Sequence, residues 1–100
     1  MNLRTAALHE VVFEDCVLRD VDFGSAKLVK ARFGGSTLLN ADFTRVSAKD
    51  VDLRRARLGS DDTPGIKAGY DSLGGTRIDS PQLMTLAPLL ARHLGITVAD

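Results

Sequence analysis

The sequence predicts an all-β solenoid, in which very short strands joined by corners wind into a coil. The first sixty residues divide into twelve consecutive five-residue units. The third residue of every unit is apolar, and the first is small or apolar. At 44% apolar composition, twelve apolar third positions in succession would arise by chance about once in 20,000 trials. A fixed short period of this kind indicates a repeat architecture.

A period of five matches neither an α-helix nor a continuous strand, but it suits a strand followed by a corner. Positions one and three of a unit are two residues apart, so in extended backbone their side chains point to the same side. Positions four and five are mostly polar, charged or glycine, as in Arg19-Asp20 and Gly34-Gly35, and such residues favour turns. Repeated corners of one sense therefore place positions one and three inside a coil.

Four units carry a resemblance to a known family: ADFTR (41–45), VDFGS (21–25), VDLRR (51–55) and MNLRT (1–5). They resemble the motif of the pentapeptide-repeat family, which is a small residue, Asp or Asn, Leu or Phe, and two loosely specified residues. The resemblance covers 1–60 and implies a right-handed, quadrilateral β-helix with four units per coil. Twelve units then give about three coils, roughly 14 Å tall at a strand spacing of about 4.8 Å.

A coil of four units places residues twenty apart directly over one another. The four phenylalanines then fall into two aromatic ladders on opposite faces, with aliphatic ladders on the other two. We expect Phe33→Ala in the middle coil to destabilise the fold by about 3–5 kcal/mol. The expected ladders are Phe13 with Phe33 and Leu53, Leu3 with Phe23 and Phe43, Leu18 with Leu38 and Leu58, and Leu8 with Leu28 and Ala48.

The C-terminal forty residues are expected to close one end of the coil within the same structural domain. The polar stretch 61–72, with its proline and glycines, predicts a loop excursion. Leu73 and Ile78 keep the five-residue register, so 73–79 predicts a partial fourth coil. Residues 80–100 then predict an α-helical cap, in which Pro88 kinks or splits the helix.

Local signals place the ends and the apolar face of this helix. Asp79 or Ser80 can serve as the N-cap with Pro81 in the first turn, and Gly95 is a fitting C-terminal stop. The apolar face consists of Leu83, Leu86, Leu90 and Leu94, at helical spacing.

Composition excludes several classes of protein. Thirteen basic and thirteen acidic residues balance to zero, which gives no general attraction to nucleic acid or anionic membranes. The single cysteine, Cys16, cannot form an internal disulfide and fits a reducing compartment. No apolar run approaches a membrane span, and no export signal is visible. We therefore expect a cytoplasmic protein that does not enter membranes.

No residues form a recognisable catalytic, metal or cofactor site, so we expect neither an enzyme nor a cofactor. His9 lies at an outward fourth position, and His93 lies near the end of the predicted helix, where positive charge is favourable. Cys16 occupies an inward first position and is expected to be a small buried thiol. No pair of cysteine or histidine residues has the spacing of metal ligands.

Two groups of apolar residues are possible interfaces, and both interpretations remain open. Ala7, Val12 and Val17 occupy outward positions in the first coil, as a contact patch or as scattered surface residues. Leu83, Leu86 and Leu90 form a cap alone or a cap that also contacts a second subunit. The N-terminal end has no predicted cover, which implies either another subunit on this edge or a longer solenoid.

The function favoured by these observations is a non-catalytic protein-interaction scaffold with an unknown protein partner. The resemblance implies an alternative, since some pentapeptide-repeat proteins protect DNA gyrase from quinolones by mimicking duplex DNA. Such mimics are long and strongly negative, whereas residues 1–58 carry ten basic and eight acidic residues, a charge of +2. Nucleic acid is not expected as a partner. The basic residues that could contact it are Lys27, Lys30, Arg32, Arg54, Arg55 and Arg57, and Arg32 shares a face with Arg54 and Arg55 in a mild basic strip.

Overall fold

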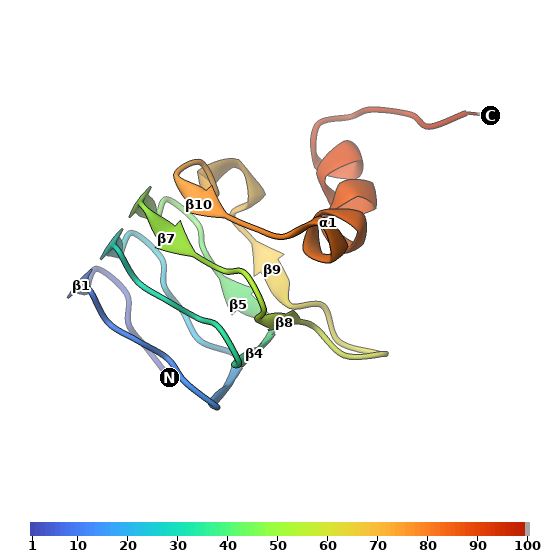
Figure 1. Ribbon diagram of the computed structural model, residues 1–100. Coiled ribbons are helices and arrows are strands. Elements are labelled where there is room, and N and C mark those ends of the chain that lie inside the picture. The colour runs from blue at the N-terminus through green and yellow to red at the C-terminus, as the bar shows by residue number, and fades with distance from the viewer. Residues whose placement is uncertain (100) are drawn as a thin grey trace.

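The computed structural model describes residues 1–99, which wind into a stack of coils with one helix across its C-terminal end (Figure 1). All strands are two or three residues long because a corner interrupts each five-residue unit. The elements are β1 (Ala7–His9), β2 (Val17–Arg19), β3 (Lys27–Val29), β4 (Thr37–Leu39), β5 (Ala41–Asp42), β6 (Ser47–Lys49), β7 (Val51–Asp52), β8 (Arg57–Leu58), β9 (Ile66–Ala68), the 3-10 helix η1 (Tyr70–Ser72), β10 (Thr76–Arg77) and α1 (Ser80–His93).

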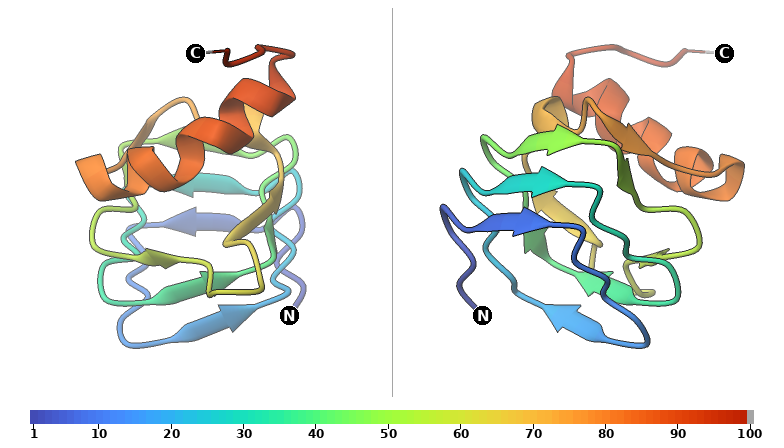
Figure 2. Two further views of the ribbon diagram at one scale, coloured as in Figure 1. Left: turned by 90° about the vertical axis from the view of Figure 1, so that its right-hand side faces the viewer. Right: turned by 60° about the vertical axis from the view of Figure 1, so that its left-hand side comes forward.

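Strands one coil apart pair in parallel at a spacing of twenty residues. In the sheet β1-β3-β6, Leu28 pairs with Leu8 on one side and with Ala48 on the other. The sheet β2-β4-β8 has the same register, and Figure 2 shows these strands stacked in layers. On the remaining two sides, isolated parallel bridges link Asn2 with Asp22 and Asp22 with Asp42, and likewise Val12 with Arg32 and Arg32 with Asp52.

The corners place the fifth residue of the first eleven units, including Gly35, in the left-handed region of the backbone. This conformation costs a residue other than glycine about 1–2 kcal/mol. The amide of the same residue donates to the next coil, as from Ser25 to the Thr44 carbonyl and from Lys30 to the Lys49 carbonyl, both at 2.9 Å. Interlayer pairing therefore offsets the corner strain. The residues with φ between +52° and +69° are Thr5, Glu10, Asp15, Asp20, Ser25, Lys30, Asn40, Arg45, Asp50 and Arg55.

We predict that Ser25→Gly stabilises the protein, because glycine adopts the φ of +58° without a Cβ clash. The expected gain in the free energy of unfolding is about 0.5–1 kcal/mol after the larger backbone entropy of glycine is subtracted. The matched change Ser47→Gly, at an exposed position within β6, should instead lose about 0.5–1 kcal/mol. Urea denaturation measures the change in the free energy of unfolding for both variants. Equal decreases in the two variants would contradict the strain argument.

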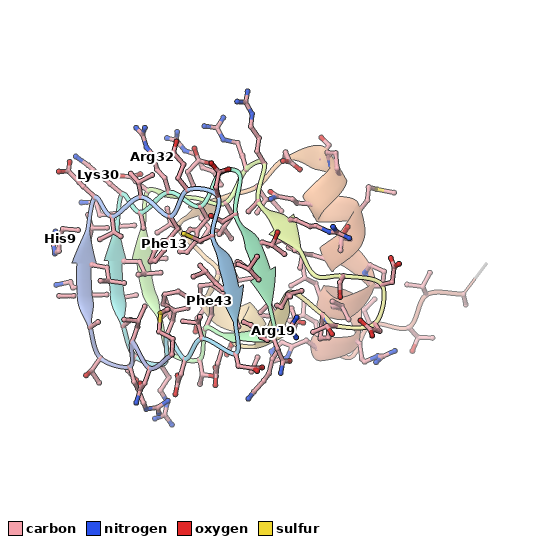
Figure 3. All side chains as sticks on the ribbon, turned by 90° about the horizontal axis from the view of Figure 1, so that it is seen from below. His9, Phe13, Arg19, Lys30, Arg32 and Phe43 are labelled. Carbon is pink, nitrogen blue, oxygen red and sulfur yellow. The ribbon has the colours of Figure 1, made fainter. Side chains whose placement is uncertain are left out.

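The four phenylalanines fill the centre of the column. Phe13 and Phe33 stack with ring centroids 4.9 Å apart, and Phe23 and Phe43 stack at 5.1 Å. The two stacks meet edge to face, since Phe23 and Phe33 lie 6.0 Å apart at 86°. Figure 3 shows Phe13 and Phe43 directed into the interior. Phe23 and Phe33 are fully buried, whereas Phe13 in the first coil is only partly covered.

We predict that Phe33→Ala lowers the free energy of unfolding by about 3–5 kcal/mol, because the cavity would lie between packed layers. Phe13→Ala removes the same atoms from the partly covered end of the same ladder, so its loss should be clearly smaller. Thermal and urea denaturation of the two variants compares them directly. Equal losses would show that the described N-terminal edge is as well packed as the middle.

The segment 61–72, predicted as a loop, is mostly part of the coil, so that prediction was wrong. The chain leaves the column after Gly59 and rejoins it at Pro64, which bridges Gly59 and whose carbonyl accepts the Asn40 amide at 2.7 Å. The strand β9 then pairs with β5, with Ile66 beside Ala41 and, after a bulge, Ala68 beside Asp42, so the spacing changes from twenty residues to twenty-five and then twenty-six. Ile66 is buried in the core. The partial last coil therefore begins at Ile66 rather than at residue 73.

The loop prediction interpreted the glycines of this segment as turn residues, but they permit close packing of the backbone. A Cβ on Gly69 would lie 2.2 Å from the Phe43 carbonyl carbon, and one on Gly65 would lie 2.5 Å from that of Leu58. These residues therefore let the last coil approach the one beneath it. Beyond η1, β10 pairs with β7 at the same spacing of twenty-five, with Thr76 beside Val51.

The helix α1 crosses the C-terminal end of the column (Figure 2). Its N-cap is Asp79, which accepts the amide of Gln82 at 2.9 Å, while the Gln82 side chain accepts the amide of Asp79 at 2.9 Å. This capping box satisfies two terminal donors. The helix is continuous through the exposed Pro88, so the predicted split does not occur. Gly95, with φ of +73°, follows its end, and residue 100 of the predicted cap lies outside the described residues.

Gln82 also provides hydrogen-bond donors for two backbone carbonyls of the last full coil. It is 6% exposed, and its side-chain amide donates to the carbonyls of Leu53 and Ala56. One coil lower, the carbonyl of Ser36 accepts the backbone amide of Arg57 at 2.8 Å. Gln82 thus supplies from a side chain the donor that another coil would supply from its backbone.

Candidate interaction surfaces

The acidic residues at second positions are built into the corners. Asp22 accepts the amide of Gly24 at 2.8 Å, and Asp42 accepts the amide of Thr44 at 2.9 Å. Asp52 accepts the amide of Arg54 at 3.0 Å. Each carboxylate thereby closes a turn two residues ahead of it. The preference for Asp or Asn at this position is explained by the corner and does not itself indicate a binding surface.

Two of these three carboxylates, those of Asp22 and Asp52, are paired with arginines. Asp22 forms an ion pair with Arg4 at 3.3 Å, and Asp52 forms one with Arg54 at 2.8 Å. Hydrogen bonds from the Arg54 side chain lower the pKa of Asp52 from 3.8 to about 2. Hydrogen bonds from Thr44 lower the pKa of Asp42. Within residues 1–99, Asp42 is therefore the one of these three carboxylates without an ion pair.

We predict that Asp52 contributes to stability at neutral pH and that this contribution disappears in acid. The folded pKa of about 2 lies below the ordinary 3.8, so the contribution is complete above pH 3.8 and is lost as pH falls towards 2. Asp52→Asn should reduce the drop in unfolding free energy over this window. Urea denaturation between these pH values measures it, and an unchanged pH slope would contradict the assignment.

Basic side chains gather on the side of the column that carries Asp52. We call Lys30, Arg32, Arg54, Arg55 and Arg77 the arginine ridge. Bridges and strand pairs fix the outward column Val12, Arg32, Asp52 and Arg77. Shallow grooves run along it, each lined in part by Arg32, Asp52 and Arg54. Figure 3 shows Lys30 and Arg32 extending away from the core on the same side.

Sequence reasoning placed Arg32 with Arg54 and Arg55 but missed Arg77. The five-residue excursion shifts Arg77 by one unit, which brings it above Asp52. The other predicted members, Lys27 and Arg57, lie in β3 and β8 on other sides.

The apolar residues predicted as an N-terminal patch are not brought together on one face. Ala7 belongs to the β1 sheet, Val17 to the β2 sheet, and Val12 to the bridge with Arg32. They lie on three successive sides of the first coil, and all are exposed. This arrangement is a ring of separate apolar residues around the edge rather than a flat contact patch.

The predicted leucines of α1 divide between its two faces. Leu86 is 3% exposed and Leu90 is partly buried, and both pack on the core. Leu83 points outward, as does Met84, which the prediction did not include. Beyond the helix, exposed apolar side chains continue at Leu94, Ile96 and Val98. The outer surface of the C-terminal segment is therefore apolar as well.

The residues considered as possible catalytic groups or metal ligands do not come together in one site. Cys16, predicted to be buried, is exposed because its unit belongs to the first coil, with no described layer beneath it. The ring of His93 lies 6.0 Å from that of Tyr70, and His9 is exposed on β1. Within residues 1–99, no three acidic, histidine or cysteine side chains gather as metal ligands would. None of the described helices has the length and hydropathy needed to cross a bilayer.

Comparison with protein families identifies the repeat. The description "Pentapeptide repeats" matches eight copies of the motif over residues 2–35 and 26–59. The chain therefore belongs to the pentapeptide-repeat family. The right-handed β-helix of this family agrees with the parallel, twenty-residue pairing described above.

Two solved structures are similar to nearly the whole chain. Both are trypsin-treated variants of QnrB1, described as a plasmid-mediated fluoroquinolone resistance protein. They share 30% sequence identity with this chain at TM-scores of 0.53 and 0.52 over 99% and 98% of its residues. The chain spans 45% of the length of each. Comparison with curated protein sequences gave no match.

Proposed function

We propose that this chain is a non-catalytic, cytoplasmic scaffold that acts by binding a protein partner. The observation that supports the proposal most directly is that the positions within each five-residue unit have separate structural roles. Inward positions fill the core, corner positions hold the backbone, and outward second positions vary from Val12 to Arg32 to Asp52 along one column. A rigid surface with freely varied outward residues suits recognition of another protein.

The proposal includes the number of coils and the way in which the C-terminal end is closed. We count about three coils over residues 1–60 and a partial fourth from Ile66, in a four-sided column closed by the helical segment from residue 80. Affinity capture with the immobilised chain, compared with the Phe33→Ala chain at a temperature at which circular dichroism shows that only this variant is unfolded, tests the scaffold. A protein retained only by the folded column supports it. Identical retention by both would overturn it.

DNA gyrase is the second candidate for the partner. The supporting observation is the 30% identity to a fluoroquinolone resistance protein over 99% of the chain, within a family in which gyrase protection occurs. Gyrase protection by this chain would need a surface other than the neutralised corner acids Asp22 and Asp52.

We predict that, if gyrase is the partner, the chain restores supercoiling by gyrase in the presence of a fluoroquinolone. The Phe33→Ala variant is the matched control because it carries the same charges on a destabilised column. Agarose-gel assays of supercoiling, with and without the drug, measure both chains. No effect of the folded chain at any concentration would remove gyrase as the partner while leaving the scaffold proposal intact.

We further propose that the chain forms a homodimer through the outer face of α1. The support is the exposed apolar series Leu83, Met84, Leu94, Ile96 and Val98, which a second copy would cover. The alternative surface is the edge of the first coil, where Met1 and Val17 are exposed.

We predict a dimeric mass in solution that the double change Leu83→Glu and Met84→Glu lowers to that of a monomer. Both side chains point away from the column, so the fold should remain. Val17→Glu is the control at the opposite end. Light scattering after gel filtration measures the mass. A monomeric parent would overturn the dimer, and loss of the dimer in Val17→Glu alone would assign it to the N-terminal edge.

A further inference from the structure

We propose that the corner of the column at Gly34-Gly35 pairs with the same corner of a second copy of this chain, in an antiparallel contact with two-fold symmetry. This inference goes beyond the proposed scaffold function and uses a surface other than the outer face of α1. It is carried by the order of residues along one corner, where the same two positions are acidic, glycine and arginine in three successive coils. The pairs are Glu14-Asp15 (the acidic row), Gly34-Gly35 and Arg54-Arg55 (the arginine row).

The register places the three pairs over one another. Bridges of Val12 with Arg32 and of Arg32 with Asp52 fix a spacing of twenty residues on the adjoining side. A groove along this corner is lined by all three pairs. Because one layer of glycines separates the two charged rows, their backbones lie two strand spacings apart, which is about 10 Å along the column.

The facing charges are not used within the chain. The two ion pairs formed within residues 1–99 involve neither Glu14, Asp15 nor Arg55, and all three residues are exposed. Asp79 also lines the groove, but its carboxylate accepts the amides of Arg55 and Gln82, each at 2.9 Å. It caps the N-terminus of α1, where the helix dipole offsets its charge.

A two-fold axis through the glycines makes this corner complementary to itself. Rotation about an axis perpendicular to the column reverses the order of the coils, so the acidic row of each copy faces the arginine row of the other. Arg54 is already paired with Asp52, so the principal contact joins Asp15 of each copy to Arg55 of the other, and symmetry forms it twice. A parallel arrangement would oppose like charges, so the charges select the antiparallel one.

The glycines leave room for the side chains of the second copy. A Cβ added to Gly34 would have the Arg54 carbonyl oxygen at 3.4 Å as its one neighbour within 4 Å, and one added to Gly35 would have an Asp15 carboxylate oxygen at 3.6 Å. Arg32 lines the same groove beside the glycines. It lies one layer along the column from the acidic row of the second copy and is a further cation for that row.

Salt separates this contact from the proposed dimer through α1. Exposed ion pairs are weak and are screened by salt, whereas contacts between apolar side chains persist at high ionic strength. The test therefore uses the chain with Leu83→Glu and Met84→Glu, in which the outer face of α1 no longer contributes. We expect this chain to associate at about 20 mM NaCl and to be monomeric at about 500 mM.

The variants reverse the charges of the facing pair in that chain. They are Asp15→Arg, Arg55→Glu and the two changes combined. Arg45 and Glu10 occupy the same fifth position of their units, with φ of +59° and +57°, so both new side chains are compatible with the backbone of a corner. Sedimentation equilibrium measures the association constant at low salt, and thermal unfolding followed by circular dichroism establishes that each variant retains the fold.

We expect each single reversal to weaken association by about tenfold or more, and the combined variant to restore it to within about threefold of the starting chain. An equal mixture of the two single variants should also associate, because the charges of the two chains then complement one another. The matched control Arg57→Glu makes the same charge change at an exposed position in β8, on another side, and should alter association by less than about twofold.

A starting chain that remains monomeric at low salt would overturn this inference, as would a combined variant that associates no better than the single ones. A loss in Arg57→Glu equal to that in Arg55→Glu would show an effect of net charge and would also overturn it. Each of these results leaves the scaffold function and the contact through α1 standing, because neither depends on the corner at Gly34-Gly35.

Discussion

Parallel pairing between residues one coil apart is the interaction on which the whole column depends. It aligns Phe13 with Phe33 and Phe23 with Phe43, so that each ring has a like ring directly above or below it. It also holds corner residues in a backbone conformation that only glycine adopts without strain. The core and the corners are therefore two consequences of one register, and neither would persist without the interlayer hydrogen bonds.

The same constraint separates structural charge from charge available for binding. A carboxylate at the second position is well placed to accept an amide two residues ahead, as Asp22 and Asp52 do. Counting acidic residues along the column therefore overstates the negative surface offered to a partner. The arginines have no equivalent role in the corner, apart from Arg54, and most of their charge points outward.

The five-residue period was sufficient to predict the register and the ladders, because both follow from which side chains point inward. The period did not predict where the repeats end. The segment from Ile66 is pentapeptide-like only after a five-residue insertion, and Gly65 and Gly69 resemble loop residues although they serve close packing. Cys16 follows the inward pattern yet is exposed, since the pattern specifies direction and not whether another layer covers the residue.

The ridge and the Gln82 contacts could be predicted only in part. Asp79 was one of two N-cap candidates in the sequence, but the contacts of the Gln82 amide with Leu53 and Ala56 depend on how α1 crosses the column. This contact occupies the carbonyls of Leu53 and Ala56, so the strand of a further coil cannot pair with them. Changes in height must then arise among the interchangeable middle layers, where duplicating a segment such as 21–40 would lengthen the rod and leave its closed end unaltered.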